Sequence, residues 1–123
     1  MKNTQVFNIS LNNMEAAFEK MRHEAGWDTN EKMYWGYYFL DHDNQKLERF
    51  AKTMQKEDYQ IIEIRSTVND NLYILHAEKH MEHSSQTLFE ECHKLAKLAN
   101  ENNIEIFDGW DVANIDQSKG LVE

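Results

Sequence analysis

Proline is absent from this sequence, and cysteine occurs once, at Cys92. A single cysteine excludes an intrachain disulfide and favours a reducing, cytoplasmic compartment. No apolar run approaches the roughly 20 residues that a membrane-spanning helix needs. No basic stretch leads into an apolar one at the start, so we expect neither a membrane segment nor a signal peptide. Only four glycines are present, so most turns must be made by Asn and Asp, whose side chains hydrogen-bond to the nearby backbone.

Basic residues are scarce relative to acidic ones. The 123 residues include 13 Lys and Arg against 22 Asp and Glu, which gives a formal net charge of -9. The basic residues are scattered singly, as along residues 46–57, where they are interleaved with Glu48 and Glu57. A chain of this charge repels a phosphate backbone. We therefore expect a basic protein partner and no direct binding to nucleic acid.

One aromatic stretch contrasts with the polar remainder. Residues 33–40 read Met-Tyr-Trp-Gly-Tyr-Tyr-Phe-Leu, with no charge. Aromatic residues favour strands, and a strand without alternating polar residues is typical of the middle of a sheet. Gly36 interrupts the stretch, which indicates a bulge or the close approach of another element. We therefore place residues 33–40 at the centre of a sheet.

The other segments alternate between helical and strand-like patterns. Apolar residues recur at helical spacing in three segments, and β-branched or aromatic residues mark the strands. Asn12, Asp43 or Asp41, and Ser84 or Ser85 can cap the helices by accepting hydrogen bonds from free backbone N–H groups. In chain order, we expect a helix at 13–25, a strand at 33–40, a helix ending near 56, strands at 59–67 and 72–81, a helix from about 85 to 100, and a strand at 104–112.

This order predicts an α+β fold of the ferredoxin-like type. After an extra N-terminal helix, the elements run β-α-β-β-α-β, which builds a four-stranded antiparallel sheet with two helices on one face. We expect the first and last of these strands to be central, and the N-terminal helix to cover the second face of the sheet. The hydrophobic content of 41% suits one core. We divide the chain into an N-terminal arm and helix at 1–26, a ferredoxin-like domain at 27–116 and a tail at 117–123.

The last expected strand reads Asn103-Ile104-Glu105-Ile106-Phe107-Asp108-Gly109-Trp110. This ending, the order of elements and the aromatic strand after an N-terminal helix resemble the regulator of ribonuclease activity B family. The resemblance covers roughly residues 27–116. It implies a small acidic α+β domain that is not an enzyme. It also implies binding to the C-terminal scaffold half of endoribonuclease E, inhibition of RNA cleavage and an altered make-up of the RNA degradosome.

We therefore expect a non-catalytic regulator that binds endoribonuclease E or another basic protein segment. Trp110 can cover the core at a strand end, and it can also anchor an interface, because Trp is enriched at binding hot spots. Acidic side chains would speed the encounter with a basic partner, and salt would weaken this effect. The residues that we expect to bind the partner are Trp110, Asp108, Glu90, Glu91 and Glu105.

An alternative is a small metal-binding or enzymatic domain. His76, Glu78 and His80 alternate along one expected strand, so their side chains point to one face. Two imidazoles and a carboxylate can hold a zinc or iron ion, but alternation alone also generates a solvated stripe of this kind. We expect no metal and no cofactor. Cys92 lies on the apolar face of its helix, where a thiol is usually a small hydrophobe, and Asp41-His42-Asp43 is expected to be a helix cap beside a solvated histidine.

A third interpretation is RNA binding through an aromatic sheet surface, as in RNA-recognition motifs. Trp35, Tyr37 and Phe39 share one face of their strand, and Tyr34 and Tyr38 share the other. We favour core packing on both faces, because the net charge opposes RNA binding and no basic residue flanks the rings.

Overall fold

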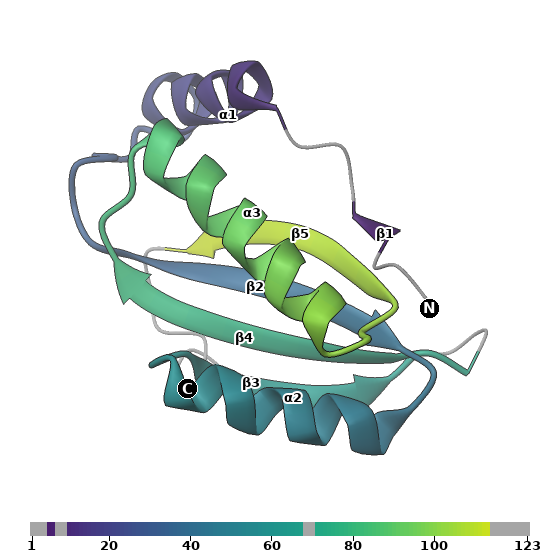
Figure 1. The fold of residues 1–123 in the computed structure, drawn as a ribbon. Coiled ribbons are helices and arrows are strands. Elements are labelled where there is room, and N and C mark those ends of the chain that lie inside the picture. The colour runs from purple at the N-terminus through teal and green to yellow at the C-terminus, as the bar shows by residue number, and fades with distance from the viewer. Residues whose placement is uncertain (1–4, 7–9, 68–70, 114–123) are drawn as a thin grey trace.

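The computed structural model describes residues 5–6, 10–67 and 71–113 (Figure 1). From residue 10 onward the elements follow the predicted order, and a two-residue strand precedes them. In chain order, the elements are β1 (Gln5–Val6), α1 (Leu11–His23), β2 (Met33–Asp41), α2 (Asn44–Lys56), β3 (Gln60–Ser66), β4 (Tyr73–Met81), α3 (Ser85–Glu101) and β5 (Ile106–Ala113). The expected tail at 117–123 lies outside the described residues, so the division of the chain at 116 stays a prediction.

The sheet has the strand order β1-β5-β2-β4-β3. β2 pairs antiparallel with β4 and β5, and β3 pairs antiparallel with β4. The four long strands therefore confirm the ferredoxin-like α+β fold, and β2 lies in the middle as predicted.

The prediction that the last strand is also central is wrong for these four strands. β4 shares the centre with β2. Among the described residues, the outer neighbour of β5 is β1, which pairs with it at Gln5 and Val6. The reason is that each helical crossover joins two parallel strands with another strand between them. The return strand of the hairpin therefore takes the central place.

β2 buries one of its faces completely. Trp35, Tyr37 and Phe39 are 0% exposed. The Phe39 ring lies 5.0 Å from that of Phe50 on α2 and 5.1 Å from that of Phe107 on β5. Burying a large apolar side chain stabilises a fold by about 1.5–3 kcal/mol, so this row of rings is a major part of the core. The predicted grouping of the three rings on one face is confirmed.

Short polar side chains begin α2 and α3. Asp43 accepts hydrogen bonds from the backbone N–H groups of Gln45 and Lys46. Ser84 forms a reciprocal capping box with Thr87. Both caps satisfy donors that the first helical turn leaves free, and both confirm the sequence-based assignment.

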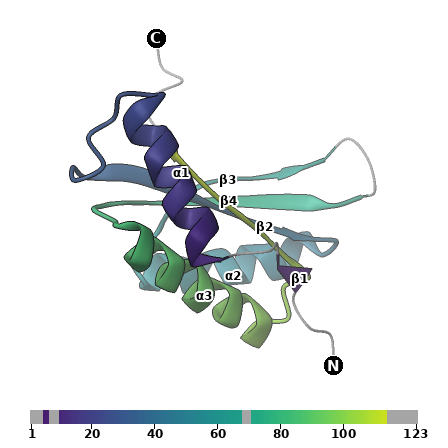
Figure 2. The same cartoon turned by 90° about the horizontal axis from the view of Figure 1, so that it is seen from above.

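α1 differs from its prediction in both its start and its position. Ser10, not Asn12, caps it by accepting a hydrogen bond from Asn13 N at 3.1 Å. The helix begins beside α3 and runs past the edge of the sheet (Figures 1 and 2), so the prediction that it covers the second face is wrong. The Phe18 ring stacks on Trp35 with the centroids 5.8 Å apart. Trp35 belongs to the core face, and its large apolar surface draws the apolar stripe of α1 to that side.

β5 contains a bulge around Gly109. Tyr37 pairs with Trp110 but Phe39 pairs with Phe107, so two residues of β5 stand opposite one residue of β2. Gly109 has a φ of 97°, a conformation that other residues rarely adopt. Because of the extra residue, Phe107 and Trp110 both face the core although they are three positions apart.

Replacing Gly109 with Ala is expected to lower the free energy of unfolding by about 1–2 kcal/mol, because a Cβ disfavours this backbone conformation. Gly109→Asn should cost less, since Asn tolerates positive φ better. Urea denaturation of the wild type and both variants measures the difference. An unchanged unfolding midpoint in Gly109→Ala would show that the bulge does not need glycine.

Candidate partner-binding surface

The second face of the sheet carries aromatic and polar side chains. In the part of the chain that the structure describes, α2 and α3 cover only the face that holds the core (Figure 2). Strand pairing turns alternate residues of the long strands toward the other side. We call this surface the open sheet face. Its members include Tyr34, Gly36, Tyr38, Leu40, Glu63, Arg65, Ile74, His76, Glu78, His80, Ile106 and Asp111. Of these, Gly36, His76 and Glu78 are buried.

Two tyrosines of β2 stack on two histidines of β4. Tyr34 lies across from His80 and Tyr38 across from His76. The ring centroids are 4.1 and 4.4 Å apart, and the ring planes are 7° and 21° from parallel. Glu78 stands between the two pairs and is 1% exposed. Burial lowers the pKa of His76 below its ordinary value, which favours a neutral ring on Tyr38.

Gly36 leaves space over the middle strand for two neighbouring side chains. A Cβ at this position would overlap Asp111 Oδ1 and would lie 2.8 Å from His76 Nε2. Tyr38 Oη donates a hydrogen bond to Asp111 Oδ2 at 2.7 Å. Burial of Tyr38 and this hydrogen bond raise the pKa of its hydroxyl above the ordinary value. The exposed Asp111 carboxylate is thus oriented by a tyrosine, and its other lone pairs can accept from a partner.

The five predicted partner-binding residues come from β5, from α3 and from the connection between them. The carboxylates of Asp108 and Glu90 belong to exposed residues. Trp110 is half-buried and packs against the core. Glu91 is also half-buried, and burial raises the pKa of its carboxyl group. Glu105 is held by hydrogen bonds within the fold, so the five residues differ in how available they are to a partner.

Glu105 belongs to a polar cluster where β2, α2 and the start of β5 meet. Asp41 is 1% exposed and accepts from Lys46 Nζ at 2.9 Å, from Glu105 N at 3.0 Å and from Asp43 N at 2.8 Å. Glu105 accepts from His42 N at 2.8 Å, and this hydrogen bond lowers the pKa of its carboxyl group to about 2. The buried Asp41 carboxylate therefore accepts a hydrogen bond from the predicted cap residue, Asp43, and connects β2 with α2 and with the segment before β5.

The residues of the metal-binding alternative share a face, as the alternation predicted. The imidazoles of His76 and His80 lie flat against tyrosine rings. Among the described residues, no group of three or more His, Cys, Asp or Glu side chains is arranged to hold a metal ion. Cys92 is buried, and burial raises the pKa of its thiol to about 12. These features give the metal-binding or enzymatic alternative no support.

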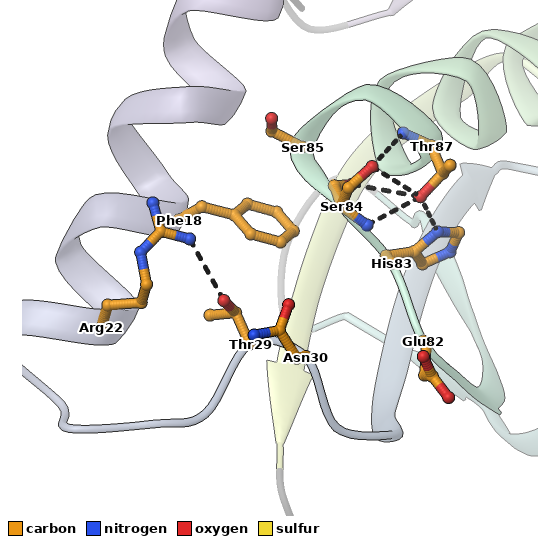
Figure 3. Close-up of a pocket in the computed structure, with 9 residues that line it drawn as sticks. All are labelled: Phe18, Arg22, Thr29, Asn30, Glu82, His83, Ser84, Ser85 and Thr87. Carbon is orange, nitrogen blue, oxygen red and sulfur yellow. Dashed lines mark hydrogen bonds between the residues drawn. The ribbon is translucent and has the colours of Figure 1, made fainter.

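A cavity of about 410 Å³ lies between α1, the connection that follows it and the start of α3 (Figure 3). Arg22 Nη1 donates to Thr29 Oγ1 at 3.1 Å, and His83 Nδ1 lies 3.0 Å from Thr87 Oγ1. Burial lowers the pKa of His83 to about 4, so its ring is neutral at pH 7. These four side chains already have partners, and they therefore do not select a ligand for the cavity.

Sequence patterns did not identify the stacked Tyr–His pairs. Alternation placed the two tyrosines together and the two histidines together, but the register between their strands depends on pairing between distant segments. The available signal was Gly36, which indicated the close approach of another element. The structure identifies that approach as Asp111 and His76.

Comparison with known protein families gives a match over most of the chain. Residues 13–112 match the family model described as Regulator of ribonuclease activity B, in agreement with the resemblance seen in the sequence. A search of curated proteins finds no match. None of the helices in the described ranges has the length and apolar character required to cross a membrane.

Gly36→Ala is expected to destabilise the protein by about 1–3 kcal/mol, because the new methyl group collides with Asp111 and His76. Adding Asp111→Ala removes the closer collision, so the double variant should be more stable than the sum of the two single effects by at least about 0.5 kcal/mol. Urea denaturation of the four proteins measures this coupling. Strict additivity would show that the carboxylate does not fill the space over Gly36.

Acid should destabilise the wild type partly through Glu105. Its folded pKa is depressed to about 2, so its carboxylate stabilises the fold above the unfolded pKa of about 4.3. This contribution is lost as the pH falls through the range from about 5 to about 2. Unfolding curves for Glu105→Gln should therefore depend less on pH in this range. Glu101→Gln, at an exposed position of α3, is the control, and equal slopes in both variants would contradict the role of Glu105.

Proposed function

The chain belongs to the regulator of ribonuclease activity B family, and we propose that it regulates RNA cleavage by binding endoribonuclease E. The family match over residues 13–112 carries this proposal, since ribonuclease activity is what the family regulates. Endoribonuclease E as the partner is supported by the resemblance of the last strand, which implies binding to the C-terminal half of that enzyme.

A basic protein segment suits the charge of the chain. A net charge of -9 attracts basic polypeptides and repels RNA phosphates, and such attraction speeds encounter. Asp108 and Glu90 are exposed, and we keep them as candidate charged contacts. Trp110 packs against the core, Glu91 is half-buried and Glu105 is hydrogen-bonded within the fold. We therefore propose that these three contribute less to binding than the two exposed carboxylates.

The proposed regulation requires no chemistry by this chain. A catalytic nucleophile or base must be chemically activated and must lie within reach of a substrate. The thiol of Cys92 is buried with a raised pKa, Asp41 is paired with Lys46, and His83 is buried beside Thr87. The chain acts by occupying endoribonuclease E and thereby reducing RNA cleavage.

The test mixes the purified chain with the C-terminal half of endoribonuclease E in a titration calorimeter, and follows cleavage of a model RNA by the full enzyme in parallel. We expect saturable binding and slower cleavage. Both effects should weaken at about 1 M salt, where the screening length falls to about 3 Å.

An unrelated acidic protein of similar size and net charge is the control for simple charge attraction. Binding of the control with equal affinity, or cleavage that stays unchanged at saturating concentrations of the chain, would rule out the proposed regulation. Cleavage of RNA by the chain alone would rule out the proposal that it is not an enzyme.

A further inference from the structure

We propose that the open sheet face is the docking surface, and that it receives arginine side chains from an extended basic segment of the partner. This inference rests on the proposed function, because it names the surface and the partner chemistry through which that function is exerted. Three observations carry it: the distribution of charge over the elements, the stacked rings, and the spacing between the two stacks.

The helix layer does not carry the negative charge of the chain. α2 has four basic residues against one acidic residue, and α3 has two basic residues against three acidic ones. Among the described residues, the open sheet face has the opposite balance, with Glu63, the buried Glu78 and Asp111 against Arg65. Arg65 is further neutralised by Glu63, whose Oε2 lies 3.2 Å from its Nε. A basic segment is therefore drawn to the sheet side more strongly than to α2.

The stacked rings favour arginine over lysine. A guanidinium group is planar, stacks on aromatic faces and donates through a rigid fork of N–H groups, whereas an ammonium group is compact and strongly hydrated. Tyr34 and Tyr38 are half-buried and His80 is exposed, whereas His76 is buried. The tyrosine of each stack is therefore accessible to a partner. Asp111 adjoins the stack at Tyr38 through a 2.7 Å hydrogen bond. A guanidinium over that stack can donate to the Asp111 carboxylate while it covers the ring.

The distance between the stacks selects an extended occupant. Tyr34 and Tyr38 are four positions apart on one strand, which places them roughly 13 Å apart at about 3.3 Å per residue. An extended peptide lying along β2 has the same rise, so its side chains at positions i and i+4 reach both stacks. The proposal thus predicts a segment with arginines spaced by three intervening residues.

The first experiment uses two synthetic probe peptides of equal length in a Gly-Ser background, one with arginine at positions i and i+4 and one with lysine at the same positions. We expect the arginine peptide to bind the wild-type chain about 5-fold more tightly. Tyr34→Leu, Tyr38→Leu and Asp111→Asn should each weaken its binding by about 5-fold or more. Glu101→Gln, at an exposed position at the end of α3, should leave it unchanged. Circular dichroism establishes that each variant is folded.

The second experiment repeats the titrations with the C-terminal half of endoribonuclease E and records amide chemical shifts. Shifts concentrated in β2, β4 and β5, with the same ranking of variants, support the docking surface. If the wild type binds this partner, and Glu90→Gln weakens binding while the tyrosine and Asp111 variants do not, the surface is wrong while the proposed function stands. If the wild type binds the arginine peptide but not endoribonuclease E, the proposed function is wrong and the recognition of arginine stands.

Two further outcomes would overturn the inference. One is equal affinity for the arginine and lysine peptides together with no effect of the tyrosine variants. The other is binding of a single-stranded oligouridine that Tyr34→Leu or Tyr38→Leu abolishes, because the face would then serve nucleic acid and not a basic peptide.

Discussion

The burial of Trp35, Tyr37 and Phe39 against the helices is the constraint on which the rest of the structure depends. β2 lies between β4 and β5, so its side chains alternate between the two faces of the sheet. Once these three rings enter the core, Tyr34 and Tyr38 must point to the opposite side. The same alternation in β4 turns its two histidines toward them. The core and the open sheet face are therefore two consequences of the placement of one strand.

The bulge in β5 connects these two faces. The extra residue at Gly109 keeps Trp110 on the core side and places Asp111 opposite Gly36. In a regular strand that had Phe107 in the core, Asp111 would also point into the core, where a charged group without a partner is costly. The Asp-Gly-Trp sequence on which the family resemblance depends thus has a structural reason. It sets the register that brings a carboxylate to the tyrosines.

Charge is distributed unevenly over this regulator of ribonuclease activity. Composition alone indicated an acidic chain, and the predicted partner-binding residues included two glutamates of α3, Glu90 and Glu91. In the fold, α2 is basic on balance, and the polar cluster around Asp41 holds Glu105 within the structure. Complementary charges across an interface raise the specificity and the rate of protein binding. The side of the molecule that combines carboxylates with accessible rings is therefore the one best suited to a basic partner.

Local sequence patterns determined the order of the elements, the caps at Asp43 and Ser84, and the two faces of β2, because each depends on residues only a few positions apart. They did not determine where α1 packs, since an apolar stripe shows that a helix is covered but not what covers it. They also did not determine the place of the last strand outside the central pair β2 and β4, or the Tyr–His stacks. Only the tertiary structure decided these features, because strand register and layer are set by competition among all the apolar surfaces of the chain for burial.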